Sequence, residues 1–408
     1  MLDTADPRTV LTAILSIGLS LAVGLPTIVS LVRWIASSLR LRLRLLLRTS
    51  SSEINKSDAS VSGIYVHPVK SMRSVSLKES TLDRKGLKDD RRFMVVYELP
   101  LPVYRKKWEE GDTNHRFLTQ RQCPSLATIS ATITQKDNID TGDPERFLVL
   151  EQIVSNGKRS STKVQIPLKN DGATRQRYLA GIWDDVVAVD DMGDEAAAFL
   201  QAIADADDEL ASTVVGDVPS SKKIVRLVTE SSKPNPLFQT TDARTYVPNY
   251  AKTWNGGFLG KPTLTDGFPI LIASEASLEA LNRRLIKGGK EAIPMSRFRP
   301  NIVVKGKSLQ PFEEDRWKVI VIGTTVFAIV KACPRCKQSC TDQVTGTVSP
   351  QMEPLTTMAS FRRSLGDQPT NGDVFFAQNA IPIGTLEGKT IKVGDPVEVL
   401  ERGDPVYL

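Results

Sequence analysis

Residues 268–286 read FPILIASEASLEALNRRLI and show a clear change of pattern. The apolar run at 268–273 predicts a buried strand, and Ser274 is placed to cap the helix that follows it. In that helix Leu278, Leu281 and Leu285 fall on one face, as expected for a helix that packs against a sheet. A strand followed directly by an amphipathic helix predicts a domain that mixes both kinds of structure.

Outside this segment the chain beyond residue 60 consists mostly of short stretches in which apolar and polar residues alternate, a pattern that predicts strands. A second helix is expected at 194–204, with Asp194 as its N-cap. The sequence therefore predicts an α+β protein that is rich in β-structure. The strands are expected at 62–66, 93–97, 127–133, 147–153, 163–167, 183–189, 302–304, 317–322, 326–330 and 391–399.

The composition narrows the class of protein. Of 408 residues, 40% are hydrophobic and 25% are charged, which is ordinary for a globular protein with a sizeable core. The net charge is +6, but six arginines and two aspartates lie in residues 1–48, so the remaining chain is close to neutral. Nucleic-acid binding is not predicted, because such a surface needs many cations on one face. Only His67 and His115 are histidines, which leaves little room for histidine-based metal sites or catalytic triads.

Residues 1–48 are predicted to form a membrane anchor with a basic flank. The stretch 9–32 has 24 residues without a charge, and as a helix it would span about 36 Å. Five arginines follow between residues 33 and 48, so the positive-inside rule predicts a body that faces the cytosol. A cleaved signal peptide is the alternative, but the apolar stretch is longer than a signal h-region and no basic segment precedes it. Residues 49–60 are Ser-rich and are predicted to be a linker.

A cluster of cysteines is the main chemical signal. Residues 331–340 read KACPRCKQSC and contain Cys333, Cys336 and Cys340, three of the four cysteines in the chain. The spacing could serve a zinc site completed by Cys123 or another distant ligand, an iron–sulfur site, a redox pair, or unligated core cysteines. A further possibility needs only one thiolate, bound to a metal whose other ligands come from a cofactor. On residue types alone these alternatives stay open.

Eight segments, taken in order, resemble one family. They are VHPVKSMRSVSL (66–77), DRRFMVV (90–96), LTQRQCPSL (118–126), ASEASLEALNRRL (273–285), FRPNIVV (298–304), ACPRCKQSCTDQVTGTV (332–348), EPLTTMASFRR (353–363) and IKVGDPVEVL (391–400). Together they are similar to the eukaryotic MOSC-domain proteins called mitochondrial amidoxime-reducing components, from about residue 60 to residue 402. The most specific part of the resemblance is R-P-N upstream of A-C-x-R-C, and the predicted anchor fits the same family.

The resemblance implies a domain order. After one transmembrane helix and the linker, it implies a MOSC N-terminal β-barrel domain at 61–190, a helical connection at 191–224 and a MOSC β-barrel domain at 225–402.

The resemblance also implies a molybdenum cofactor, a pterin whose dithiolene chelates the metal and which ends in a phosphate. In this family the second cysteine of A-C-x-R-C, here Cys336, is the catalytic molybdenum ligand. Cys333 corresponds to the first cysteine and is not expected to bind metal, and Cys340 is expected to be dispensable. One expected cofactor contact is Arg92, but because Arg91 directly precedes it, the assignment of this contact is open by one residue. The expected cofactor contacts are Lys70, Ser71, Arg92, Arg299, Asn301, Pro334, Arg335 and Cys336.

The implied activity is a two-electron reduction of amidoximes, hydroxylamines and N-oxides, with nitrite as a further candidate. The sequence has no flavin, haem or iron–sulfur signature, so the electrons are expected to come from a partner protein. The resemblance implies that the donors are cytochrome b5 and its NADH-dependent reductase. The expected location is the mitochondrial outer membrane, with the endoplasmic reticulum as the alternative. Two other functions stay open, a sulfur carrier of the cofactor-sulfurase type and a non-enzymatic, membrane-tethered zinc-binding module. Sulfurases carry a large pyridoxal-phosphate domain ahead of the MOSC unit, whereas about 60 residues precede the region of resemblance in this sequence.

Overall fold

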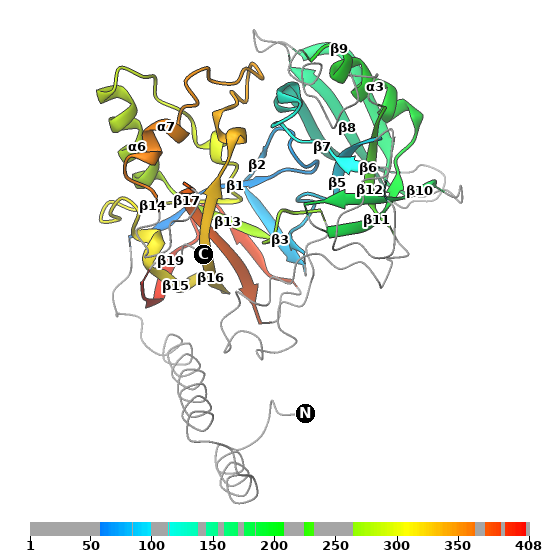
Figure 1. The fold of residues 1–408 in the computed structure, drawn as a ribbon. Helices are drawn as coiled ribbons and strands as arrows, with labels where there is room; N and C mark the ends of the chain where they lie inside the picture. The colour runs from blue at the N-terminus through cyan, green and yellow to red at the C-terminus, as the bar shows by residue number, and fades with distance from the viewer. Residues whose placement is uncertain are drawn as a thin grey trace, which may run out of the picture. The chain divides into compact units, whose positions relative to one another are not determined.

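The computed structural model describes residues 58–83, 85–98, 113, 115–137, 144–153, 159–169, 175–183, 185–207, 224–231, 264–363, 372–384 and 388–404 (Figure 1). The chain divides into two compact units, Met1–Ile54 and Asn55–Leu408, and the described residues all belong to the second. The predicted membrane span at 9–32 and most of the predicted linker lie outside the described residues. Within the described ranges, no helix combines the length and the apolarity needed to cross a bilayer.

Residues 268–286 form a strand and a helix, as predicted, within the larger sheet. β13 (Ile270–Ser274) leads into α6 (Glu275–Lys287), and the chain returns in β14 (Ile302–Lys305), which pairs with β13 in parallel. A parallel pair needs a long crossover connection, and α6 provides it. The remaining pairs of this sheet are antiparallel. The order of the strands is β19 (Val397–Arg402), β15 (Trp317–Ile322), β16 (Thr325–Arg335), β17 (Val374–Ile383), β13, β14, β1 (Ser60–Val66) and β2 (Val75–Leu77).

The apolar face of α6 packs into a core beside this sheet. Leu281 and Leu285 are fully buried there, in one cluster with Leu271 of β13 and with Phe298. Ser274 occupies the N-cap position, but in the described part of the chain its hydroxyl has no hydrogen-bond partner. The predicted position of the cap is therefore confirmed, whereas the predicted capping bond is not formed.

A second sheet closes on itself as a barrel. Its strands run in the order β10 (Arg177–Ile182), β11 (Asp185–Asp191), β12 (Val225–Glu230), β5 (Phe93–Glu98) and β6 (His115–Phe117), and a parallel β6–β10 pair completes the ring. Full closure removes the open edges that a sheet otherwise exposes. The barrel agrees with the predicted N-terminal β-barrel domain.

The helix α3 (Asp194–Asp205) contributes Leu200 and Ile203 to a core that also contains residues of β5 and β12. Its N-cap residue is Gly193, one residue before the predicted Asp194, so the Asp194 carboxylate lies in the first turn. A carboxylate in the first turn still interacts favourably with the positive end of the helix dipole.

Two three-stranded sheets and several short helices complete the described fold. The first sheet contains β7 (Ile129–Asp137), β8 (Pro144–Ile153) and β9 (Arg159–Pro167), and its buried residues join the core that contains α3. The second contains β18 (Thr390–Lys392), β3 (Glu79–Asp83) and β4 (Gly86–Leu87). The short helices are η1 (Pro124–Thr128), η3 (Met295–Phe298), η4 (Glu313–Arg316), η5 (Lys337–Cys340) and α7 (Leu355–Ala359).

Strand pairing joins the two predicted domain ranges. β1, from the predicted range 61–190, pairs with β14 in the larger sheet, whereas β12, from the predicted range 225–402, completes the barrel. The backbone N–H of Lys70, shortly after β1, donates to the oxygen of Phe93 in the barrel at 2.8 Å. The domain ranges stay a prediction. Because β1 pairs within the larger sheet and Lys70 bonds to the barrel, residues 67–72 lie between the two sheets.

Several predicted strand boundaries are wrong, among them the following three. β16 runs to Arg335 rather than to Val330, because its pairing with β17 continues beyond a bulge. The predicted strand at 391–399 is split into β18 and β19 by a turn with Gly394 at φ 94°, a conformation that favours glycine. The predicted strand at 183–189 begins at Asp185, because Trp183 lies in the turn after β10 with φ 55°. The first residue of the cysteine cluster, Cys333, therefore lies in a strand.

Candidate functional site

Cys336 lies where the chain leaves the larger sheet. β16 ends one residue earlier, and Cys336 directly precedes η5. Its side chain is exposed, whereas Cys340 is fully buried and Cys333 packs against an apolar core. The backbone oxygen of Cys336 accepts hydrogen bonds from the N–H and the hydroxyl of Ser339, at 3.0 and 2.9 Å. These two bonds fix the turn that carries the thiol, which is called the cysteine turn below.

Arg335 links the cysteine turn to the segment with the R-P-N motif. Its Nε donates to the oxygen of Phe376 at 3.0 Å and its Nη1 to the oxygen of Phe298 at 3.1 Å. Its Nη2 is buried and has no hydrogen-bond partner in the described part of the chain. A buried N–H without a partner is costly, so an added acceptor would be stabilised at this position.

Arg297 makes a second link between the same two segments. Its guanidinium donates to the oxygen of Cys340 at 2.8 Å and to the Asp342 carboxylate at 3.0 Å. These bonds hold η3 against η5. Arg299 follows η3 at once, with a left-handed backbone at φ 53°, and only 9% of this residue is exposed.

Arg299 connects both segments to the chain after β1. Its Nη1 donates to the oxygen of Met72 at 2.5 Å and to Gln343 Oε1 at 3.5 Å. Gln343 and Gln120 exchange two hydrogen bonds, at 2.9 and 3.1 Å, and Gln120 also donates to the oxygen of Ser71 at 2.7 Å. A buried network thus joins residues from four separate parts of the sequence.

Arg91 belongs to this network. Its guanidinium donates to Asn301 Oδ1 at 3.1 Å, to the oxygen of Arg299 at 3.4 Å and to the buried Asp90 carboxylate. Only 13% of the Arg91 side chain is exposed.

Arg92, the residue predicted from the sequence, points elsewhere. Its Nη2 donates to both carboxylate oxygens of Asp83, at 2.9 and 2.7 Å, and to the oxygen of Leu87 at 3.3 Å. Arg91 has a positive φ of 49°, so the side-chain alternation of the strand that begins at Phe93 does not extend to it. The structure therefore brings Arg91 into this hydrogen-bond network in place of the predicted Arg92.

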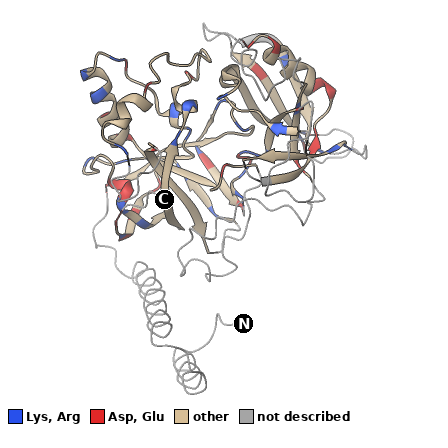
Figure 2. Ribbon diagram, in the orientation of Figure 1, with Lys and Arg blue, Asp and Glu red and all other residues tan. Residues whose placement is uncertain are grey.

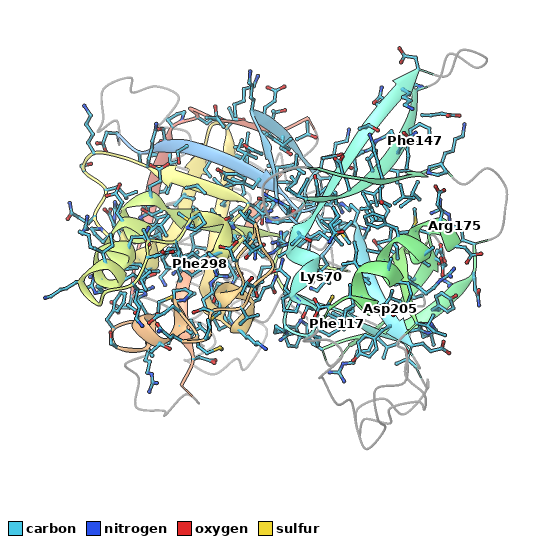
Figure 3. The ribbon with its side chains drawn as sticks, turned by 90° about the horizontal axis from the view of Figure 1, so that it is seen from above. Lys70, Phe117, Phe147, Arg175, Asp205 and Phe298 are labelled. Atoms are coloured by element: carbon cyan, nitrogen blue, oxygen red, sulfur yellow. The ribbon has the colours of Figure 1, made fainter. Side chains whose placement is uncertain are left out.

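Lys70 is buried and is held by one carboxylate. Its Nζ donates to Asp266 Oδ1 at 2.5 Å and to the oxygen of Leu264 at 3.4 Å, and it lies 5.6 Å from the centroid of the Phe117 ring. Figure 3 shows Lys70 beside Phe117. Burial lowers the pKa of Lys70, and the Asp266 carboxylate opposes that fall. Because an ammonium group has three donors, one N–H is left for a ligand.

Three other predicted residues lie in the same region. Asn301 is buried, and its side chain donates to the oxygen of Tyr65 at 3.2 Å and accepts from the N–H of Leu271 at 3.1 Å, so it bridges β1 and β13. Ser71 is buried with φ 67°, and Pro334 is an exposed residue of β16 beside Cys336. The structure gives Asn301 a clear structural role.

The cluster carries more positive than negative charge, although Figure 2 shows basic and acidic residues interspersed along the fold. Arg299 and Arg335 hydrogen-bond to carbonyl and amide oxygens among the described residues, not to carboxylates. Burial lowers the pKa of Arg299 to about 9, and repulsion from Arg91 adds to the fall. A dianion such as a phosphate monoester would compensate both guanidinium charges. The cations of the cluster are Lys70, Arg91, Arg297, Arg299 and Arg335, and its carboxylates are Asp90, Asp266 and Asp342.

These features fit a phosphate-bearing pterin that carries a thiolate-binding metal. The exposed Cys336 thiol offers a soft ligand for a metal already held by sulfur. The Arg299 and Arg335 guanidinium groups, which have no carboxylate partner among the described residues, offer donors to an anionic cofactor, and the Nη2 of Arg335 is buried without a partner. The residues present are therefore suited to hold the implied cofactor.

The zinc alternative finds no support in the described part of the chain. Among the described residues, no three His, Cys, Asp or Glu side chains are arranged to hold a metal ion. Burial raises the pKa of Cys333 and raises that of Cys340 to about 11, which keeps both groups as thiols near neutral pH. Cys123, the predicted distant ligand, lies in the core that contains α3, with its sulfur 3.4 Å from Asp207.

Sequence reasoning missed six residues of the cluster and its hydrogen-bond network. Asp90, Gln120 and the pair Asp342–Gln343 lie inside segments that carry the resemblance, and Arg297 lies two residues before Arg299, so these five were within reach of a motif argument. Asp266 was not, because its partner Lys70 lies 196 residues away in the sequence.

The chain is similar in sequence to known protein domains and to known proteins. The chain matches the MOSC N-terminal beta barrel domain over residues 58–206 and the MOSC domain over residues 260–398. It is 28% identical over 349 residues to the mitochondrial amidoxime-reducing component 1 of Xenopus laevis, which covers 84% of this chain and 82% of that protein. It is also 28% identical to the mitochondrial amidoxime reducing component 2 of Rattus norvegicus, over 85% of this chain and 82% of that protein. The molybdenum cofactor sulfurase of Oryza sativa subsp. japonica is 27% identical over 85% of this chain but only 36% of that protein. These matches confirm the resemblance predicted from the sequence.

Proposed function

We propose that this chain, which belongs to the MOSC-domain proteins, reduces N-hydroxylated compounds with a molybdenum cofactor held at the cysteine turn. The observation that carries the proposal is the exposed Cys336 thiol next to a buried basic cluster in which Arg299 and Arg335 have no carboxylate partner among the described residues. Relatives named as amidoxime-reducing components support the reductase class, and a relative named as a cofactor sulfurase supports the link to this cofactor.

The residues of the cluster would divide the work of holding the cofactor. Cys336 would bind the metal, while Arg299, Arg91 and Lys70 would neutralise and orient the phosphate. Arg335 would donate its buried Nη2 to the cofactor, in addition to fixing the cysteine turn through Phe298 and Phe376. When bound, the molybdenum cofactor supplies a two-electron redox centre able to accept an oxygen atom.

The overall reaction is balanced by two electrons and two protons. An N-hydroxylated compound R–NH–OH gives R–NH2 and water, so the N–O bond breaks, the nitrogen is reduced, and one proton reaches the nitrogen while the other leaves with the oxygen. Amidoximes, hydroxylamines and N-oxides share the bond that breaks. Nitrite remains a further candidate substrate.

The electrons would come from a partner protein. We infer a one-electron haem donor, cytochrome b5, that is itself reduced by its NADH-dependent reductase. The uncharged stretch at 9–32 would anchor the chain, and relatives with mitochondrial in their names favour the mitochondrial outer membrane. An anchor in the same membrane would raise the effective concentration of such a donor.

A sulfur-carrier function is the second candidate, because the match to the rice cofactor sulfurase covers most of this chain. It also needs a reactive thiol at the cysteine turn. The two candidates differ in their product, since a sulfur carrier holds a persulfide and reduces no N–O bond.

The direct test is the reduction of benzamidoxime to benzamidine by the cofactor-loaded full chain, with reduced methyl viologen as the electron donor. This donor makes the test independent of the partner proteins. Cys336→Ala is expected to reduce the activity to background, whereas the matched variant Cys333→Ala is expected to keep most of it, because Cys333 is not a metal ligand in this proposal. Equal activity of Cys336→Ala and wild type would contradict the proposal.

A further inference from the structure

Trp183 lies at the rim of the basic cluster, although no motif pointed to it. Its indole N–H donates to Asp266 Oδ1 at 2.9 Å, and the same oxygen accepts from Lys70 Nζ at 2.5 Å. The Asp266 carboxylate also contributes to the raised pKa of Cys333, after burial and against the opposing effect of Arg335. Trp183 is therefore one carboxylate away from a predicted cofactor contact.

The indole ring is held in one orientation. The guanidinium carbon of Arg121 lies 4.2 Å from the centroid of the Trp183 ring, and the Phe117 ring lies 5.3 Å away at an interplanar angle of 54°. Together with the hydrogen bond to Asp266, these contacts come from two segments of the chain, because Phe117 and Arg121 lie in the same segment and Asp266 is distant in sequence. A ring held by three contacts loses little conformational freedom when a ligand binds to it.

This orientation is kept at a cost in stability. The Trp183 backbone has φ 55°, which is unfavourable for any residue other than glycine, and 41% of the residue is exposed. A fold that needed this tryptophan only for its core would bury it, as it buries Trp317, which is 0% exposed. A strained, exposed and rigid aromatic side chain next to a binding site indicates a ligand contact.

We propose that Trp183 is a specificity-determining residue whose exposed ring stacks on planar aromatic substrates. This inference rests on the proposed reductase function, since it names the substrate class that the same site prefers. Arg121 covers the indole ring at stacking distance, so a flat substrate would meet the remaining exposed surface. Aromatic stacking of this kind corresponds to a preference of about threefold to tenfold over a substrate without a ring. Asp266, 62% exposed at its side chain, would lie beside the polar group of such a substrate.

Two variants separate the ring surface from the indole hydrogen bond. Trp183→Leu and Trp183→Phe both lose the N–H to Asp266, but only Trp183→Phe keeps an aromatic surface. The readout is the ratio of kcat/KM for benzamidoxime to kcat/KM for hydroxylamine, with reduced methyl viologen as the electron donor. Trp183→Leu is expected to lower this ratio about threefold to tenfold, mainly through KM for benzamidoxime, and Trp183→Phe is expected to restore most of it. Ile286→Ala, at an exposed position of α6, is the control for surface substitution.

Several outcomes would overturn the inference. The ratio could be unchanged in Trp183→Leu, or Trp183→Leu and Trp183→Phe could lower it equally, which would assign the effect to the hydrogen bond. A loss of molybdenum from Trp183→Leu would make Trp183 a cofactor contact instead.

A binding measurement distinguishes failure of this inference from failure of the proposed function. The probe is the line width of the benzamidoxime ring protons in the presence of wild type, Trp183→Leu or Trp183→Phe, which requires no turnover. Broadening by wild type and Trp183→Phe but not by Trp183→Leu supports the stacking surface even if no reduction is observed. Equal broadening by all three proteins, or none by wild type, overturns it.

Discussion

Two neighbouring arginines give a matched test of how the proposed cofactor is anchored. Arg91→Lys and Arg92→Lys change adjacent residues in the same way and both keep the positive charge. They differ in surroundings, because Arg91 hydrogen-bonds within the basic cluster while Arg92 pairs with Asp83, whose side chain is 48% exposed. A lysine cannot reproduce the forked contacts of a guanidinium group.

The contacts of Arg91 set the expected size of the effect. Lysine would lose the bonds to Asn301 at 3.1 Å and to the Arg299 oxygen at 3.4 Å, which contribute about 1 kcal/mol each at most to the free energy of unfolding. Loss of one charge-assisted bond to the phosphate would cost about 1.5–3 kcal/mol of cofactor binding, or roughly 10- to 150-fold in affinity. The exposed pair of Arg92 contributes about 0.5 kcal/mol to stability and nothing to cofactor binding.

The assay is the rate at which each purified protein releases its pterin, followed by the fluorescence of the oxidised pterin after filtration. Thermal unfolding of the same samples monitors stability. Arg91→Lys is expected to release the cofactor markedly faster than wild type, and Arg92→Lys at the wild-type rate. Faster release from Arg92→Lys than from Arg91→Lys would refute the placement of Arg91 and restore the register predicted from the sequence.

Two further predictions concern pH and stability. Glu314 is fully buried, its carboxyl accepts a hydrogen bond from Ser277 at 2.8 Å, and burial raises its pKa to about 7 from an ordinary 4.5. The folded state then binds the proton more tightly than the unfolded state, so stability falls as pH rises from 4.5 to 7. Urea titrations of Glu314→Gln should show that about 2–3 kcal/mol of the wild-type loss in unfolding free energy between pH 5 and 8 is absent. His67 is also fully buried, and burial together with repulsion from Arg299 and Arg91 lowers its pKa to about 3 from an ordinary 6.5. Here the unfolded state binds the proton more tightly, so stability falls as pH drops below 6.5. The same urea titrations of His67→Phe should show that about 2 kcal/mol of the wild-type loss in unfolding free energy between pH 7 and 5 is absent.

The two substitutions change the slope of the stability curve in opposite directions over overlapping pH ranges, and therefore control for each other. Glu314→Gln should leave the loss of stability on acidification below pH 6.5 in place, and His67→Phe should leave the loss on raising the pH from 4.5 to 7 in place. An unchanged slope between pH 5 and 8 in Glu314→Gln would mean that Glu314 is ionised in the folded protein. A wild-type acid slope in His67→Phe would mean that His67 is charged when folded.

Much of the fold could be predicted because local patterns determine it. The segment 268–286 was assigned correctly as strand and helix, since its apolar run and its leucine spacing are strong local signals. The extension of β16 into the cysteine cluster was missed, because it depends on pairing with β17, which lies about 40 residues further along the chain. The closure of the barrel by β6 and β10 was equally inaccessible, since their paired residues lie 65 positions apart.

The residues of the candidate site also fall into those that local sequence motifs could locate and those that they could not. Motifs located Cys336, Arg299 and Arg335, which the structure brings together through η3 and the cysteine turn. They could not decide between Arg91 and Arg92, because the positive φ at Arg91 ends the alternation on which a side-chain argument depends. Trp183 carried no signal, because the sequence predicted a strand at that position and the turn that exposes the ring is visible only in three dimensions.

The central claim is that Cys336 binds the molybdenum of a pterin cofactor, and metal content tests it most directly. Molybdenum and zinc would be quantified together in the full chain, in wild type, Cys336→Ala and Cys333→Ala, all produced in a host that makes the cofactor. The account predicts close to one molybdenum per chain in wild type and Cys333→Ala, with a phosphate-bearing pterin released on denaturation, and a marked loss of molybdenum in Cys336→Ala. One zinc per chain without molybdenum in wild type, lost when either cysteine is replaced, would contradict it.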